Sequence, residues 1–152
     1  MALICCLLLP FATTLASPPD TSFSRLWTWS GDGDVCIYVQ GTREGGSIAT
    51  GTTTFGDGVY QMWVAKIDEL GNITWEWFDG GPGTEGGDTI EQMADGSYIL
   101  SGESNSYTPG FAWFLMKIDH LGNEVWSRVL ESTNNYDWPV SAQELPGGDI
   151  IS

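Results

Sequence analysis

Basic residues are scarce in this chain of 152 residues, which carries 5 Lys and Arg against 20 Asp and Glu. The formal net charge is therefore -15 at pH 7. A nucleic-acid partner is disfavoured, because binding a polyphosphate requires a cationic surface that displaces counterions. An anionic membrane surface is disfavoured for the same reason. The acidic balance is compatible with calcium binding, or with a saline external medium that screens self-repulsion.

Cysteine and histidine are also few. Cys5 and Cys6 lie in an apolar N-terminal segment, so its removal would leave Cys36 without a partner for an internal disulfide. Because no His or basic residue is near it in sequence, Cys36 is interpreted as a buried structural thiol. His120 is the single histidine and is interpreted as a solvated turn residue. No zinc-ligand cluster and no Ser, His and Asp set is present, so we expect no catalytic residue and no cofactor.

Long apolar runs are limited to residues 2–16. An apolar stretch followed by small residues, with Thr14 and Ala16 before Ser17, is typical of a signal peptide. No Lys or Arg precedes the apolar stretch, so Met1 need not be the natural start. A membrane anchor is the alternative, but the run is shorter than the roughly 20 residues that span a bilayer. We expect a signal peptide at 1–16, a linker at 17–25, and a secreted or cell-surface protein without membrane insertion.

Helical periodicity is absent from every long window, whereas 20 Gly and 19 aromatic residues (8 Trp, 5 Tyr and 6 Phe) favour a β-rich fold. A search for self-similarity aligns residues 44–78 with 95–129 at a shift of 51, with ten identities in 35 positions. The identities indicate a duplication. The paired residues are Gly45 and Gly96, Ile48 and Ile99, Gly51 and Gly102, Lys66 and Lys117, Ile67 and Ile118, Asp68 and Asp119, Leu70 and Leu121, Gly71 and Gly122, Asn72 and Asn123, and Trp75 and Trp126.

Partial copies flank the two whole ones. Residues Gln143, Gly147 and Ile150 follow the second copy at the same shift of 51, and the segment 27–29 resembles the segment 75–77. The expected units therefore cover the residues in four parts: a strand of a preceding or closing unit at 26–33, whole units at 34–87 and 88–137, and the start of a further unit at 138–152.

Each whole unit is predicted to hold four antiparallel strands. In the second unit, strands are expected near 88–93, at 98–102, at 111–118 and at 124–130, with turns at 94–97 and 119–123. The third of these is almost entirely apolar, as expected for a strand covered on both faces. Gly122 and Asn123 suit a left-handed turn, and Asp119 can accept backbone hydrogen bonds across it. The repeated residues are therefore interpreted as structural.

The signatures from Asp95 to Gly102 and from Lys117 to Trp126 resemble the blade repeat of secreted and cell-surface β-propeller proteins of bacteria and archaea. In that family the signatures read Asp-Gly-Gly-Tyr before an apolar stretch and Gly, and Lys-x-Asp-x-x-Gly-Asn-x-x-Trp. The resemblance covers 26–152 and implies an all-β fold of about two and a half four-stranded blades in an incomplete ring. It implies no shared catalytic residues. Quinoprotein propellers and sialidase-type Asp boxes have different spacings, although the quinoprotein scaffold is the nearer of the two.

The sequence offers candidates for two kinds of binding site. Asp32 and Asp34 offer carboxylates that calcium prefers, but the segment 30–34 lacks the distal Glu of a full calcium loop and also suits a plain loop between blades. Because Trp and Tyr rings can stack on sugars, the aromatic residues indicate a glycan as the other candidate ligand. Because Trp75 and Trp126 recur, they are interpreted as packing residues. The surface candidates are instead the aromatic residues that do not recur, namely Phe55, Tyr107, Tyr136 and Trp138.

The sequence therefore predicts a non-catalytic extracellular or cell-surface propeller segment that serves as a scaffold for adhesion or ligand binding. Its partner would be a protein or a glycan. The alternative is the scaffold portion of an exported polysaccharide-active or quinoprotein-like enzyme, with catalytic residues elsewhere. Since each blade buries its faces on its neighbours and neighbouring blades are missing from this chain, we expect the isolated chain to be unstable or to self-associate.

Overall fold

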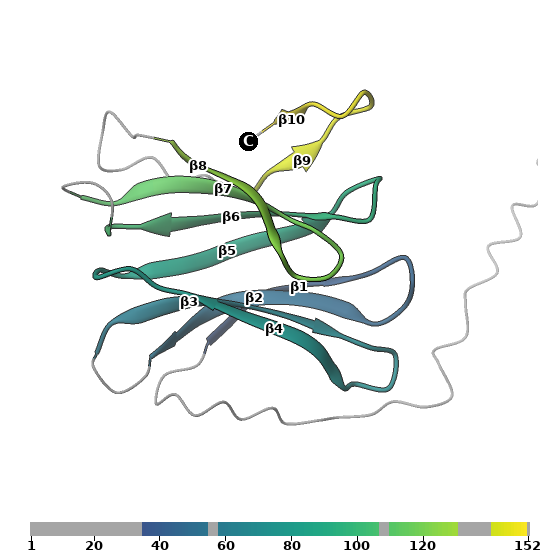
Figure 1. Ribbon diagram of the computed structural model, residues 1–152, viewed down its shortest axis with the longest axis horizontal. Coiled ribbons are helices and arrows are strands. Elements are labelled where there is room, and N and C mark those ends of the chain that lie inside the picture. Colours follow the sequence, from purple (N-terminus) through teal and green to yellow (C-terminus); the bar gives the residue numbers. More distant parts are fainter. Residues whose placement is uncertain (1–34, 55–57, 107–109, 131–140, 152) are drawn as a thin grey trace, which may run out of the picture.

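A computed structural model describes residues 35–54, 58–106, 110–130 and 141–151. Within these ranges the chain is all-β, with two four-stranded antiparallel sheets and a small two-stranded hairpin (Figure 1). The expected fold class is therefore confirmed at the level of strands and sheets. The expected strand at 26–33 lies outside the described residues.

Each strand pairs with the next along the chain, so both large sheets are simple antiparallel meanders. In the second sheet the strands follow the expected positions closely, although its first strand begins at Glu85, ahead of residue 88. The first sheet contains β1 (Val35–Gly41), β2 (Ser47–Thr54), β3 (Tyr60–Ile67) and β4 (Ile73–Asp79); the second contains β5 (Glu85–Gln92), β6 (Tyr98–Ser104), β7 (Ala112–Ile118) and β8 (Glu124–Leu130); the hairpin contains β9 (Gln143–Glu144) and β10 (Ile150–Ile151).

The pairing register repeats at the shift of 51 found in the sequence. Ser47 lies opposite Ile67 in the first sheet, and Tyr98 lies opposite Ile118 in the second. The irregularities repeat as well. The register shifts between Cys36 and Tyr38 and again between Gly87 and Thr89, and both β3–β4 and β7–β8 are irregular after the repeated lysine. The two sheets are thus copies of one structural unit.

The hairpin β9–β10 begins a third copy, but its offset differs from the expected 51. The Met93 N–H donates to the Ser97 carbonyl (2.8 Å), and the Leu145 N–H donates to the Asp149 carbonyl (2.7 Å). Residue 145 follows residue 93 by 52 positions, and the pairing of Ile150 with Glu144 repeats that of Tyr98 with Gln92 at the same offset. The third copy therefore follows the second at a shift of 52, one residue more than the shift of 51 expected from the sequence.

The two sheets pack face to face, and the same face of each unit meets the next one. Ile48 and Val64 of the first sheet share a core cluster with Ile90 and Leu100 of the second. In turn Ile99 and Leu115, which occupy the positions of Ile48 and Val64 in the second unit, pack with Ala142 near the hairpin. The contact is thus head-to-tail and is made twice.

The third strand of each unit is mostly buried. In β7 every residue except Lys117 is buried, which confirms the expected interior strand. The apolar β7 is therefore an interior strand, and the units before and after its own cover its two faces.

Cys36 differs from its interpretation as a buried thiol. It lies at the bulge of the edge strand β1, and its side chain is exposed and unpaired by any disulfide. Partial desolvation raises the pKa of the Cys36 thiol, opposed by its contact with the Tyr38 carbonyl. A raised pKa leaves this exposed thiol a poor nucleophile.

Candidate functional site

The second motif of each unit closes the turn between its third and fourth strands. The Leu70 and Asn72 N–H groups donate to Asp68 Oδ1 (2.9 and 2.7 Å), and Asn72 Nδ2 donates to Asp68 Oδ2 (3.0 Å). The second copy makes the same three bonds between Asp119, Leu121 and Asn123. The hydrogen bonds from Asn123 hold the pKa of Asp119 below its usual value. The expected turn role of these aspartates is confirmed.

The repeated glycines have two distinct structural roles. Gly71 and Gly122 take the left-handed backbone conformation, with φ of 78° and 90°, whereas no described residue other than glycine has positive φ. Asn123 is therefore not left-handed, contrary to the expectation. Gly51 and Gly102 instead allow the neighbouring strand to approach closely. A Cβ on Gly51 would lie 1.9 Å from the Val35 carbonyl oxygen, and a Cβ on Gly102 would lie 2.1 Å from the Gly86 carbonyl oxygen.

The repeated lysines bind an acidic residue in the first turn of their own unit. Lys66 Nζ lies 3.3 Å from Glu44 Oε1, and Lys117 Nζ lies 2.8 Å from Asp95 Oδ2. Lys66 also donates to the carbonyls of Gly45 (3.4 Å) and Ile67 (3.3 Å). The sequence analysis missed this pairing, although an acidic residue stands at the same repeat position in both copies.

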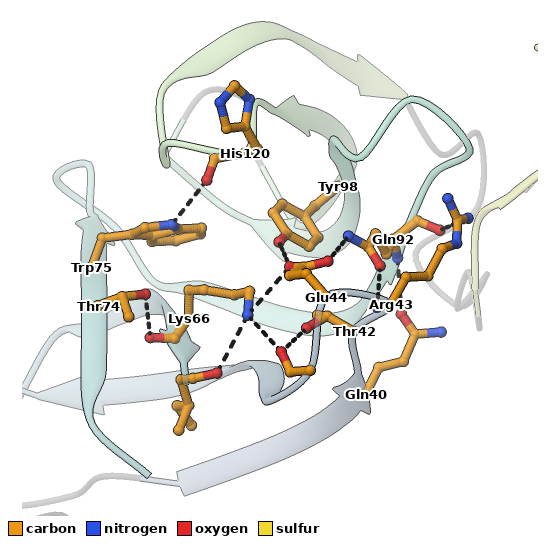
Figure 2. A network of polar contacts seen from close by, with 12 residues as sticks. Gln40, Thr42, Arg43, Glu44, Lys66, Thr74, Trp75, Gln92, Tyr98 and His120 are labelled. Atoms are coloured by element: carbon orange, nitrogen blue, oxygen red, sulfur yellow. Dashed lines mark hydrogen bonds and ion pairs between the residues drawn. The ribbon is translucent and has the colours of Figure 1, made fainter. Parts of the chain in front are cut away.

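Glu44 is the centre of a network that joins the two sheets. Figure 2 shows its carboxylate between Lys66 of the first sheet and two side chains of the second. Tyr98 donates to Glu44 Oε1 (3.1 Å), and Gln92 Nε2 donates to Glu44 Oε2 (2.8 Å). Desolvation raises the pKa of Glu44, but hydrogen bonds from Gln92, Lys66 and Tyr98 outweigh it and lower the pKa to about 2. Glu44 is therefore a structural anion at neutral pH.

A second polar contact between units occurs twice. The Arg43 N–H donates to Gln92 Oε1 (2.9 Å), and the Ala94 N–H donates to Glu144 Oε2 (2.6 Å). Ala94 occupies the position of Arg43 one unit later, and Glu144 occupies that of Gln92. Each unit therefore satisfies a backbone donor in the turn of the unit before it.

The repeated tryptophans pack against the following unit. Trp75 Nε1 donates to the His120 carbonyl (3.3 Å), and the ring meets the edge of Tyr98 with centroids 6.1 Å apart. A Cβ on Gly122 would lie 2.9 Å from the Trp75 ring, so this glycine permits the close approach. Trp126 packs against the cluster that includes Ala142. The packing role expected for both tryptophans is confirmed.

A groove opens where the turns of both sheets converge. Its volume is about 740 Å³, and its walls come from the four turns around residues 44, 69, 95 and 120, together with Lys66, Thr74, Gln92 and Trp75. All four turns lie at the same end of the molecule (Figure 1). Trp75 therefore has a double placement: it packs between the units and also lines the groove.

Most polar side chains of the groove are engaged within the protein, but two are not. The carboxylate of Glu69 and the imidazole of His120 have no hydrogen-bond or ion-pair partner among the described residues. Both side chains are exposed. They occupy the same position of the two turn motifs, where the repeat does not preserve the residue. The groove is therefore lined both by residues that repeat and stabilise each unit and by residues that differ between the two units.

A smaller cavity of about 360 Å³ at the opposite ends of the strands contains the buried carboxylate of Glu85. This carboxylate accepts hydrogen bonds from the Gly81 N–H (2.9 Å), Ser104 Oγ (3.0 Å) and the Ser106 hydroxyl. Burial, with the charges of Glu85 and Glu124, raises the pKa of Asp79 nearby. Because Glu85 is fully satisfied by the loops that flank it, its role is structural.

The remaining expected site residues lie outside the described ranges. These are the calcium candidates Asp32 and Asp34 and the aromatic candidates Phe55, Tyr107, Tyr136 and Trp138. Among the described residues, no three His, Cys, Asp or Glu side chains are grouped so as to hold a metal ion. The same part of the chain contains no helix long and apolar enough to cross a membrane.

The chain matches no known family model and no curated protein.

Proposed function

We propose that the two sheets are neighbouring blades of a β-propeller, and that this chain is a non-catalytic extracellular scaffold that binds a ligand. The groove beside Trp75, between the turns of the two units, is the proposed binding site. The observation that carries the proposal is that residues varying between the repeats, Glu69 and His120, line one open groove with an aromatic ring.

The propeller arrangement is supported by the repeated interface. The same sheet face, the same backbone contact and the same tryptophan join the first unit to the second and the second to the third. Identical head-to-tail contacts between four-stranded antiparallel units are what a radial array of blades requires. The blade motifs named above supply the family resemblance.

The absence of catalysis is proposed from the state of the acidic residues. Glu44 and Asp95 in the groove are each held by a lysine. Carboxylates fixed as structural anions are unsuited to exchanging protons with a substrate. Glu69 and His120 are the proposed contacts for the ligand.

The test is a glycan and protein array probed with the full chain, followed by a hydrolysis assay on every ligand it retains. The proposal expects retention without turnover, and expects Trp75→Ala to abolish retention. Turnover of a bound glycan would instead support the scaffold of a polysaccharide-active enzyme. Retention that Trp75→Ala does not change would place the binding site outside the groove.

A further inference from the structure

We infer that the groove binds a basic segment of a partner protein, with an arginine guanidinium on the Trp75 ring and the Glu69 carboxylate. This inference rests on the proposed function, and it adds the chemical class of the ligand and the residues that recognise it. It also assigns the variable position of the turn motif, which is Glu69 in the first unit, as the position that selects a cation.

The charge of the groove favours a cation. Four carboxylates line it against a single ammonium group, that of Lys66. Lys66 is engaged by Glu44 and by two backbone carbonyls, so its charge is compensated within the protein. The chain as a whole adds a net charge of -15, and a negative field of this kind attracts cationic ligands and raises their association rate. The four carboxylates belong to Glu44, Asp68, Glu69 and Asp95.

Glu69 is the carboxylate that is open to a ligand. Glu44 and Asp95 pair with lysines, and Asp68 accepts the hydrogen bonds of its own turn. Glu69 is exposed, and no described residue gives its carboxylate a hydrogen bond or an ion pair. A Cβ on Gly45 would collide with the Glu69 side chain, so Glu69 lies across the neighbouring turn, along the wall of the groove. Its two oxygens suit the two parallel N–H donors of a guanidinium.

Trp75 supplies the second recognition element. It is half-buried, lines the groove, and is tethered through its N–H to the His120 carbonyl between Tyr98 and Gly122. Figure 2 shows the His120 imidazole directed away from this ring, so only the backbone of His120 takes part in this contact. An indole face attracts cations, and a planar guanidinium also stacks on it. A ring already held in place loses little conformational entropy on binding.

The dimensions of the groove favour a protein segment over a metal ion. Its carboxylates come from three different turns, around residues 44, 69 and 95, and no three His, Cys, Asp or Glu side chains of the described ranges are grouped to hold a metal ion. The volume of about 740 Å³ lies in the range of sites that enclose a ligand of many atoms. A chain with several basic side chains matches carboxylates that are spread out in this way.

The experiment is titration calorimetry of the full chain with capped hexapeptides of arginine, lysine, glutamine and glutamate. The salt concentration is about 0.15 M, at which charges more than about 8 Å apart are largely screened. We expect the arginine peptide to bind more tightly than the lysine peptide, and the other two not to bind. Glu69→Gln should weaken binding of the arginine peptide about fivefold. Asp79→Asn removes one carboxylate outside the groove and should change it less than about twofold.

The outcomes separate the ligand class from the proposed function. Equal weakening by Glu69→Gln and Asp79→Asn would mean that the peptide responds to the net charge of the chain, and would overturn the inference. Tighter binding of the lysine peptide would overturn the guanidinium contact with Trp75. If no peptide binds, the basic segment is excluded, while retention on the array that Trp75→Ala abolishes would still uphold the groove as a binding site. Thermal melts of each variant confirm that it is folded.

Discussion

Lys66 shows how one residue of a repeat motif can hold the groove together. Its side chain is 9% exposed, and it bridges Glu44 to two backbone carbonyls. We predict that Lys66→Met lowers the free energy of unfolding by about 1 to 3 kcal/mol, because both carbonyls lose a donor. Glu44 is half exposed and keeps its hydrogen bonds from Tyr98 and Gln92 in this variant. The loss of the ion pair itself therefore contributes little to the change in the free energy of unfolding.

The matched control is Lys117→Met in the second unit. Lys117 is 20% exposed and bonds to Asp95, which is itself exposed. We expect Lys117→Met to lower the free energy of unfolding by less than about 1 kcal/mol. Urea denaturation of both variants measures the difference. Equal losses would contradict the view that Lys66 acts through buried carbonyls.

Asp88 gives the stability a pH dependence of known sign. It lies at the bulge of β5, where burial, followed by the charge of Glu103, raises its pKa to about 6. In the unfolded chain the pKa is close to 3.8. Between those values the folded protein binds the proton and the unfolded chain does not, so this residue makes stability fall as pH rises from about 4 to about 6.

We therefore predict that Asp88→Asn raises the free energy of unfolding at pH 7 by roughly 1 kcal/mol, after allowance for partial exposure, and leaves it nearly unchanged below pH 4. Urea titrations of the wild type and the variant from pH 3.5 to 7.5 give the difference curve. Glu91→Gln, on the same strand, serves as the control for loss of one negative charge. A difference curve that is flat between pH 4 and 6 would contradict the raised pKa.

At the scale of elements, the turn 119–123 sets the distance between units. Gly122 and Gly96 both have positive φ, of 90° and 85°, but a Cβ on Gly96 would meet nothing within 4 Å. We predict that Gly96→Ala lowers the free energy of unfolding by about 1 kcal/mol through backbone strain alone. Gly122→Ala should cost about 1 kcal/mol more and change the fluorescence of Trp75, because its Cβ would push into the ring.

Thermal and urea melts with tryptophan emission compare the two variants. Should Gly96→Ala and Gly122→Ala be equally destabilising, with unchanged emission, the contact of Trp75 with this turn would be refuted.

Local elements were predictable from the sequence because their causes are local. The turn of Asp68 and Asn72 follows from side chains that bond to backbone within five residues, and the strand β7 follows from its unbroken apolar run. The ion pairs of Lys66 and Lys117 were missed because their partners are set by strand register, which periodicity does not reveal. The offset of the third copy was missed because three matches cannot locate a single inserted residue.

The groove was not predictable for a different reason. Glu69 and His120 are 51 positions apart and look like unrelated surface residues of two turns. They line one groove only because the units stack head-to-tail. The recurrence of Trp75 correctly indicated packing, but recurrence could not show that the packed ring also borders an open space.

At the scale of the whole molecule, equivalent positions in the three copies differ in burial. Ile90 and Ala142 are 0% and 1% exposed because a preceding unit covers them, whereas Val39, at the same position in the first unit, is 60% exposed. Val39 lies on the face that a preceding unit would meet. We predict that the isolated chain associates through this face, because the interface between units is head-to-tail.

Light scattering across a concentration series measures the association. Val39→Lys should shift the chain toward the monomer, whereas Val125→Lys, at an exposed position of β8, should not. A compact, cooperatively melting monomer at every concentration would contradict the prediction.

The central claim is that two repeated units form one body around the groove, joined by a shared core and by Trp75 and Glu44. Native-state hydrogen exchange in increasing urea, resolved by peptide mass spectrometry, tests it most directly. The account predicts that the amides of β3 and β7 become exposed in one transition, with equal free energies, and that Trp75→Ala separates them. Opening of β1–β4 in the wild type while β5–β8 stays protected would contradict it.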